Sequence, residues 1–331
     1  MRITIKEGES VGKRLLLCMA AALMMHAGTL QAQTANWIEA GSPSGRCCMS
    51  MAYDGATQST VLFSGTGPGP TYYGDTWVWR GGWFRLSPAT SPSPRSGGGM
   101  AFDGAAGNVV LFGGYSDTGT YLNDTWTWDG TNWTQQFPPV SPPARTAAMV
   151  YDAATGTVLL FGGGNAAGVL GDTWAWDGLA KTWTQQHPGA SPSARSAPMA
   201  YDGATKTVVL FGGNGNGAVE FTDTWNWNGT TWIQQFPASA PSARTAASMT
   251  YDPGLAAVVL FGGFAGNWPN SLNDTWAWSG ANWREIHPAT VPPNRYSFGM
   301  DYDPIGKVVL MFGGYSSGPA RGDTWLLALA P

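Results

Sequence analysis

Residues 95–136 read RSGGGMAFDGAAGNVVLFGGYSDTGTYLNDTWTWDGTNWTQQ and contain one complete copy of a unit that recurs along the chain. Its Met-Ala-Phe-Asp segment alternates small and large residues, and Val-Val-Leu-Phe is continuously apolar, as in a strand buried on both faces. The two tryptophans of Asp-Thr-Trp-Thr-Trp share one face, because side chains alternate along a strand. Asp-Gly and Gly-Gly turns separate these segments, and a more polar strand from Trp133 onward completes the unit. The unit therefore predicts four short strands.

The unit occurs in six copies at intervals of 49 to 51 residues. Each copy begins with an arginine: Arg46, Arg95, Arg145, Arg195, Arg244 and Arg295. Each copy also contains Asp-Thr-Trp, which ends at Trp77, Trp126, Trp174, Trp225, Trp276 and Trp325. Four strands repeated at this interval are typical of a propeller blade. We predict an all-β, six-bladed β-propeller with four-stranded antiparallel blades and with the repeated tryptophans buried between them.

The two ends of the repeat region complement each other. The sixth copy stops after its Asp-Thr-Trp and lacks an outer strand, whereas residues 35–39 (ANWIE) match residues 281–285 (ANWRE) of the fifth copy. We predict that residues 34–40 supply the outer strand of the last blade. This closure removes an open sheet edge, which would otherwise invite aggregation.

The first 32 residues have the pattern of a secretory signal peptide. Four basic residues precede an apolar stretch, Leu15 to Met25, which is too short to span a bilayer, and small and polar residues then lead to Ala32. We predict cleavage there, export to the periplasm or the extracellular space, and one propeller domain over residues 33–331. No other segment is apolar and long enough for a membrane helix, so no integral membrane segment is expected in the mature chain.

Composition restricts the partners of the mature chain. Cleavage would leave 13 basic and 19 acidic residues of the 17 and 21 in the whole chain, a net charge of −6. Nucleic acids call for a basic footprint, so they are not expected as partners. Charged residues make up only 11% of the chain, whereas glycine and tryptophan are abundant, at 46 and 18 residues. Such a composition favours a turn-rich all-β chain, which we expect to be a monomer.

The series Arg…Tyr-Asp…Leu-Phe-Gly-Gly…Asp-Thr-Trp…Trp resembles the kelch repeat, and the resemblance covers residues 34–329. It implies a propeller similar to the central domain of galactose oxidase, a member of that family. The copper site of that enzyme uses two histidines and two tyrosines, one of them linked to a cysteine. After residue 32 only His187 and His287 remain, at equivalent positions two blades apart. We therefore predict no copper site, no metal and no cofactor.

The repeated charged residues leave two alternatives open. The arginines could pair with the repeated aspartates, or they could form a ring of guanidinium groups that binds carboxylate or phosphate near one mouth of the channel. The kelch resemblance supports the second alternative, since arginines at similar positions take part in binding acidic peptides. The aspartates of Asp-Thr-Trp are expected to cap loops or to accept backbone N–H groups.

The loops between the glycine pair and Asp-Thr-Trp vary in length and content, and variable loops on a rigid scaffold commonly carry recognition. Their aromatic side chains and few charges suit a sugar or a peptide. Together with the six arginines, the candidate ligand-binding residues are Tyr72, Tyr73, Tyr115, Tyr121, Glu220, Phe221, Trp268, Tyr315 and Arg321. The alternative is that these loops are solvent-exposed turns.

Three hypotheses for function follow. The first is an exported, non-enzymatic module that binds a glycan or a protein through these loops. The second is a carbohydrate-active enzyme with a channel site, similar to the sialic acid mutarotase of the kelch family; Glu220 and Arg321 could then act as acid–base and sugar-orienting groups. The third is a structural cell-surface protein. No catalytic residue is assigned. The adjacent Cys47 and Cys48 could form a strained vicinal disulfide or remain two thiols that fill the core.

Overall fold

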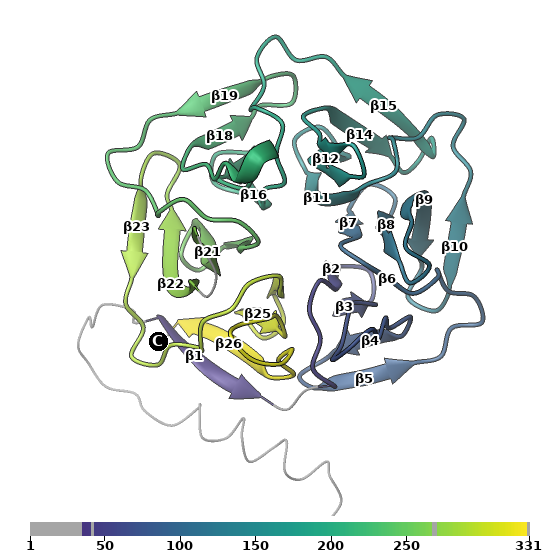
Figure 1. Cartoon of the computed structure of the whole chain (residues 1–331), viewed down its shortest axis with the longest axis horizontal. Coiled ribbons are helices and arrows are strands. Elements are labelled where there is room, and N and C mark those ends of the chain that lie inside the picture. Colours follow the sequence, from purple (N-terminus) through teal and green to yellow (C-terminus); the bar gives the residue numbers. More distant parts are fainter. Residues whose placement is uncertain (1–34, 41–42, 267–269, 330–331) are drawn as a thin grey trace, which may run out of the picture. The chain divides into compact units, whose positions relative to one another are not determined.

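The computed structural model describes residues 35–40, 43–266 and 270–329, and these residues form six antiparallel sheets arranged as the blades of a propeller (Figure 1). The predicted fold class is confirmed. Among the described residues the single helix is a short 3-10 turn at Asn216–Ala218, and no helix there is long and apolar enough to cross a bilayer. The predicted signal peptide and its cleavage point lie outside the described residues.

The first three blades follow one another along the chain, and each runs from an inner to an outer strand. Blade 1 consists of β2 (Ser50–Asp54), β3 (Ser59–Phe63), β4 (Thr76–Trp79) and β5 (Trp83–Leu86). Blade 2 consists of β7 (Gly99–Asp103), β8 (Asn108–Ser116), β9 (Tyr121–Trp128) and β10 (Trp133–Gln136), with β6 (Arg95–Ser96) also paired to β8. Blade 3 consists of β11 (Thr146–Asp152), β12 (Thr157–Asn165), β14 (Thr173–Asp177) and β15 (Thr182–Gln186), with β13 (Gly168–Val169) paired to β12.

The last three blades repeat this order, except at the outer edge of blade 6. Blade 4 consists of β16 (Met199–Asp202), β17 (Thr207–Phe211), β18 (Thr224–Trp227) and β19 (Trp232–Gln235). Blade 5 consists of β20 (Ser248–Asp252), β21 (Ala257–Phe264), β22 (Ser271–Trp278) and β23 (Trp283–Ile286). Blade 6 consists of β24 (Gly299–Asp303), β25 (Val308–Phe312), β26 (Thr324–Leu329) and the N-terminal β1 (Ala35–Ala40). Strand β1 pairs antiparallel with β26, which confirms the predicted closure.

The core lies between neighbouring blades, where apolar second strands pack against tryptophans. In one such interface Phe112 of blade 2 lies edge-on to Trp183 of blade 3, with ring centroids 5.2 Å apart. The indole N–H of Trp183 also donates to the hydroxyl of Thr125 in blade 2, at 2.9 Å. The same bond joins four other pairs: Trp83–Thr324, Trp133–Thr76, Trp232–Thr173 and Trp283–Thr224. The threonine of Asp-Thr-Trp therefore has a defined role, since its hydroxyl accepts a hydrogen bond from the indole N–H of a tryptophan in the following blade.

Burial differs among the tryptophan positions. The second and third tryptophans are buried, apart from a partly exposed Trp83. Most of the first tryptophans are only half-buried, and their indole N–H groups donate to a carboxylate near the blade end; Trp276, for example, donates to Asp274 at 2.7 Å. The prediction that every repeated tryptophan is buried between blades is therefore correct for the second and third positions and only partly correct for the first.

Connections alternate between the two ends of each blade, because neighbouring strands are antiparallel. We call one end the turn face; it carries the short turns after the first and third strands, such as residues 54–59 and 79–83 of blade 1. We call the other end the loop face; it carries the variable loops after the second strands and the connections to the next blade. The central channel therefore has a turn mouth and a loop mouth.

Candidate functional site

The six repeated arginines are buried, and each forms an ion pair with the aspartate of an Asp-Thr-Trp segment. The pairs are Arg46–Asp75, Arg95–Asp124, Arg145–Asp172, Arg195–Asp223, Arg244–Asp274 and Arg295–Asp323. In each pair the arginine side chain is at most 1% exposed and the carboxylate 11–24%. Of the two alternatives, the structure therefore shows arginine–aspartate pairing. It does not show an exposed ring of guanidinium groups.

Arg244 illustrates how completely such a guanidinium is engaged. Its five N–H groups donate twice to Asp274, at 2.7 Å each, and once each to the Gly262 carbonyl, the Ser242 carbonyl and the Ser242 hydroxyl. Burial opposes ionisation of Asp274, but the hydrogen bonds and charge of Arg244 outweigh it and hold the pKa of the carboxyl below its usual value. The pair thus fixes the end of the blade to the connection between blades.

A different set of aspartates caps the turns. We expected the Asp-Thr-Trp aspartates to cap loops or to accept backbone N–H groups; their main partners are arginine and tryptophan side chains, and Asp75, Asp172, Asp274 and Asp323 each also have a backbone hydrogen bond that acts less strongly on the pKa. The aspartates that end the inner strands do the capping: Asp103 accepts the N–H groups of Ala105 and Ala106 at 3.0 and 3.1 Å. The spacing of Asp-Gly turns contained this signal, since an aspartate before a tight turn commonly bonds its own backbone two residues on.

The loop mouth is a cavity of about 360 Å³, lined by the residues that lead into the inner strands. Backbone hydrogen bonds join successive blades around it. Ser297 donates to Ala246, Cys48 to Ser297, and Gly97 to Cys48, each at 2.8 Å. All four residues have φ between +53° and +63°, a left-handed conformation that glycine adopts without strain and the other three do not. Inter-blade bonding therefore holds this rim in a fixed shape.

Three half-buried aromatic residues from blades 5 and 6 form a cluster beside the loop mouth; we call Phe264, Tyr296 and Tyr315 the aromatic cluster. The rings of Phe264 and Tyr296 are 5.5 Å apart, and those of Tyr296 and Tyr315 are 6.2 Å apart. Backbone bridges between Thr245 and Phe264 and between Tyr296 and Tyr315 hold them in place. Of these three, Tyr315 was predicted from the sequence. Phe264 begins a variable loop and Tyr296 follows a repeated arginine, and neither was among the predicted ligand-binding residues.

The other predicted aromatic residues are distributed around the loop face. Tyr115 and Tyr121 pack edge to face in blade 2, with ring centroids 4.9 Å apart. Tyr73 and Phe221 instead lie over the buried guanidinium groups of Arg46 and Arg195, at 3.9 and 3.6 Å, and so cover ion pairs.

The remaining predicted loop residues have local partners. Tyr72 bridges back to Thr66 within its own loop. Glu220 of blade 4 accepts the backbone N–H of Gly266 in blade 5 at 2.8 Å, and Arg321 donates to Ser316 at 3.0 Å. Glu220 and Arg321 are thus engaged separately, and the structure does not bring them together as an acid–base pair. Trp268 lies outside the described residues.

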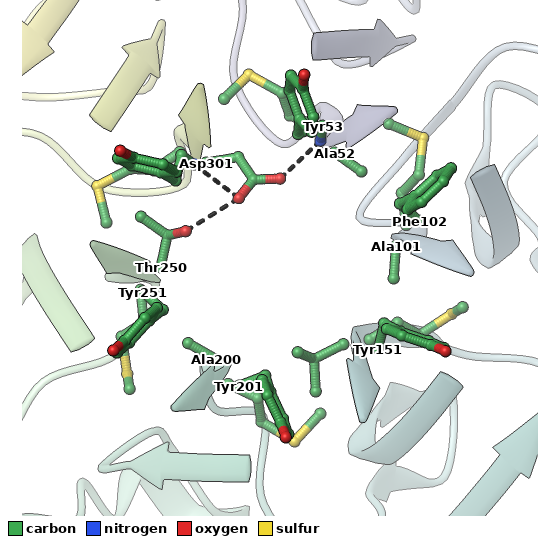
Figure 2. A pocket seen from close by; sticks show the side chains of 18 of the residues that line it. Ala52, Tyr53, Ala101, Phe102, Tyr151, Ala200, Tyr201, Thr250, Tyr251 and Asp301 are labelled. Carbon is green, nitrogen blue, oxygen red and sulfur yellow. Dashed lines mark hydrogen bonds between the residues drawn. The ribbon is translucent and has the colours of Figure 1, made fainter. Parts of the chain in front are cut away.

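The turn mouth of the channel is a cavity of about 340 Å³ encircled by one aromatic residue from each inner strand. These are Tyr53, Phe102, Tyr151, Tyr201, Tyr251 and Tyr302. Between them Figure 2 shows Asp301 extending into the channel. Its carboxylate accepts the N–H of Tyr53 at 2.7 Å, the N–H of Tyr302 at 2.8 Å and the hydroxyl of Thr250 at 2.9 Å. Asp301 thereby links blades 1, 5 and 6.

Asp301 was missed by the sequence analysis. Asp301 is half-buried in the turn mouth, and desolvation of its carboxyl group raises its pKa even though the three hydrogen bonds act in the opposite direction. A signal was present: the residue between methionine and the aromatic is Ala52, Ala101, Val150, Ala200, Thr250 and then Asp301. A single charged residue in an otherwise uncharged column of the repeat marks a special position.

The thiols and imidazoles lie in different places. Cys47 and Cys48 are free thiols at the loop mouth, with their sulfur atoms 2.7 Å apart. His187 and His287 are exposed at the ends of outer strands. Among the described residues, no group of three or more His, Cys, Asp or Glu side chains is arranged to hold a metal ion.

Closed blades with a repeated arginine, a glycine pair and Asp-Thr-Trp define a propeller built from kelch-type repeats. The model of the KLHDC2/KLHL20/DRC7 Kelch-repeats domain matches residues 80–234, from the outer strand of blade 1 to that of blade 4. This match and the six-bladed fold together support a kelch-repeat β-propeller. A comparison with curated proteins finds no match. Kelch propellers generally bind proteins, so the family indicates a protein-interaction module.

Proposed function

We propose that this protein is an exported, non-enzymatic binding module that recognises a segment of a partner protein at the loop mouth, beside the aromatic cluster. The observation that carries the proposal is the convergence of Phe264, Tyr296 and Tyr315 at one side of that mouth. Tyrosine combines a large apolar ring with a polar hydroxyl, and it is enriched where proteins make contact. The kelch family supports the same reading.

The size and charge of the mouth restrict the ligand. A cavity of about 360 Å³ is at the small end of the range for ligand pockets, so it suits one or two side chains of an extended segment or loop. Outside the ion pairs, the charged side chains among the described loop residues are Asp117, Glu220 and Arg321. The ligand segment is therefore expected to be uncharged or weakly basic, with an apolar or aromatic anchor.

The test is a peptide array probed with the full chain, run beside a glycan array. A Tyr296→Ala, Tyr315→Ala double variant removes two rings of the aromatic cluster. A Tyr201→Ala, Tyr251→Ala double variant is the matched control, because these tyrosines lie at the turn mouth of the same channel. We expect selective peptide binding that the first variant loses and the control retains.

Other outcomes decide against the proposal. Selective binding to glycans alone, lost in the first variant, would replace the protein ligand with a sugar at the same mouth. Loss of peptide binding in the turn-mouth variant only would move the site to the other face. Absence of binding on both arrays by a folded chain would contradict recognition at the loop mouth altogether.

A second candidate is a sugar-converting enzyme with its site in the channel, and Asp301 is the observation that favours it. A carboxyl group with a raised pKa inside a cavity is suited to general acid–base chemistry. The turn mouth around Asp301 is lined by the aromatic rings of the inner strands. Faster interconversion of sugar anomers by the native chain than by Asp301→Asn, followed by NMR, would support this candidate; equal rates would exclude it.

The proposed export, and the proposed division into a signal peptide and a propeller domain, rest on the sequence pattern of residues 1–32. Expression in a Gram-negative host followed by N-terminal sequencing of the periplasmic and extracellular fractions tests both. We expect the exported chain to begin at Gln33, and a chain retained in the cytoplasm with its original N-terminus would contradict this prediction.

A further inference from the structure

Cys47 and Cys48 lie at positions where the other blades show that sulfur is not needed for folding. The residue after the repeated arginine is serine, threonine or tyrosine in the other five blades. The position of Cys48 is taken by Gly97, Ala246 and Ser297 in the blades with the same spacing, and all four residues share the left-handed conformation. Packing and backbone geometry therefore do not explain two adjacent thiols.

The two thiols are held in place by backbone hydrogen bonds on both sides. Cys47 exchanges two bonds with Thr66 of its own blade, at 2.8 and 2.9 Å. Cys48 donates to Ser297 of blade 6 and accepts from Gly97 of blade 2, each at 2.8 Å. With the backbone fixed, the Sγ atoms lie 2.7 Å apart, and an S–S bond of about 2.05 Å needs little further approach.

The two thiols differ in access and in acidity. Cys48 is partly exposed and lines the loop mouth, whereas Cys47 is fully buried beneath it. The hydrogen bond from Cys47 lowers the pKa of the Cys48 thiol despite burial, and the same bond together with burial raises the pKa of Cys47. Thr66, Ser297, Tyr296 and Tyr315 are the polar and titratable groups that face the pair. Cys48 is thus the accessible and more nucleophilic thiol.

We propose that Cys47 and Cys48 are a redox-active vicinal dithiol that exchanges with low-molecular-weight disulfides entering the loop mouth. The Cys48 thiolate attacks the disulfide RSSR, forming a Cys48–SR mixed disulfide and releasing RS⁻. Cys47 then gives up its proton and attacks the Cys48 sulfur, which closes the Cys47–Cys48 disulfide and releases the second RS⁻. In sum, two cysteine thiols are oxidised, RSSR is reduced to two RSH, and the two thiol protons pass to the released thiolates.

The bond formed in this way is expected to be reversible. Adjacent Cα atoms are about 3.8 Å apart, shorter than the usual spacing in disulfides, and such constraint makes an S–S bond easier to reduce. The pair is therefore suited to a switch rather than to a permanent cross-link. Thr66, which contacts the Cys47 sulfur at 3.1 Å, begins the loop that carries Tyr72 and Tyr73, so oxidation alters the loop face directly.

The experiment uses the full chain with Cys18→Ser, which leaves Cys47 and Cys48 as its cysteines. The folded protein is treated with oxidised glutathione, quenched by alkylation and analysed by intact mass and peptide mapping. We expect the loss of two hydrogen atoms without retained glutathione, and recovery of both thiols after dithiothreitol. In the reduced protein, alkylation of Cys48 should be at least about ten-fold faster than that of buried Cys47.

Two serine variants test the order of the steps, and the protein itself shows that serine fits both positions. Serine occupies the position of Cys47 in blade 2 (Ser96) and the position of Cys48 in blade 6 (Ser297). Cys47→Ser should stop at one glutathione on Cys48, and Cys48→Ser should resist modification. A native protein that stays reduced or keeps glutathione would overturn the proposal, as would equal reactivity of the two variants. If a variant fails to fold, the mass of the native product alone decides.

Discussion

Breaking one Arg–Asp ion pair should show that the repeated arginines stabilise the loop-face end of each blade. The perturbation is Asp274→Asn, which keeps the size of the side chain and removes its charge. Arg244 is 1% exposed and directs two of its five hydrogen bonds to this carboxylate. After the substitution, the guanidinium charge stays buried without its counter-charge.

The structure sets the size of the expected effect. Removing one partner of a buried ion pair costs about 3–5 kcal/mol, because the remaining charge is left without compensation. Asp274 is 24% exposed, so water solvates part of this site and the lower end, about 3 kcal/mol, applies. An Arg244→Met, Asp274→Asn double variant leaves no buried charge and should lose at least about 1 kcal/mol less than Asp274→Asn alone.

The assay is equilibrium unfolding in urea, followed by tryptophan fluorescence. The exposed Arg85→Met is the control, with an expected change within about 0.5 kcal/mol. The folded pKa of Asp274 lies below its unfolded value, so its contribution is present above the unfolded pKa and is lost as the pH falls through the folded pKa. Native and variant stabilities should therefore converge in acid. A cost below about 1 kcal/mol at neutral pH, as for a surface pair, would refute the reasoning.

Further predictions concern the tryptophan bonds, the channel carboxylate and the loop contacts. Trp232→Phe keeps an aromatic ring but removes the N–H hydrogen bond to Thr173, and it should lower the free energy of unfolding by about 1–2 kcal/mol. Trp232→Ala also removes the ring and should lower it by about 3–5 kcal/mol. Equal losses for the two variants in urea unfolding would contradict the role of the hydrogen bond. The folded pKa of Asp301 is raised above its unfolded value. The stability of the native chain relative to Asp301→Asn should therefore be highest below the unfolded pKa and should fall as the pH rises through the folded pKa. A stability difference that is constant with pH, or that changes in the opposite direction, would argue against desolvation of this carboxyl group. Glu220→Ala leaves the N–H of Gly266 without its carboxylate partner, so hydrogen exchange at that amide should be about ten-fold faster, and unchanged exchange would disprove the contact.

The fold could be predicted from the sequence because each blade is specified locally and repeated. The alternation in Met-x-Tyr-Asp, the apolar run and the paired tryptophans each define one strand, and their order gives the meander of a blade. Closure was predictable too, because residues 35–39 match residues 281–285 at the place where the sixth copy lacks a strand. These inferences need only short-range patterns.

The site could be predicted only in part, because its contacts join residues far apart in the chain. The bonds of Asp301 reach Tyr53 and Thr250, which are 248 and 51 positions away. The choice between a paired and an open arginine ring depends on three-dimensional geometry that the spacing does not contain. Likewise Cys48 and Ser297 adopt a left-handed conformation without being glycine, so nothing in their identity indicated the rim of the loop mouth.

The departures from the repeat are the best guide to function in this protein. Six similar blades would present six equivalent surfaces, whereas a single ligand without six-fold symmetry needs one distinctive site. The departures from the repeat include residues of blades 6 and 1: Tyr296 and Asp301 in the former, Cys47 and Cys48 in the latter, with Asp301 at the turn mouth and the others on the loop face. The chain break of the closed ring lies within blade 6, between β26 and β1, so blade 6 is held together by pairing of the two chain ends, and β1 leads into β2 of blade 1 as the other outer strands lead into the next blade. These irregular residues, rather than the repeated ones, are therefore the positions at which the proposed recognition and thiol exchange are best tested by substitution.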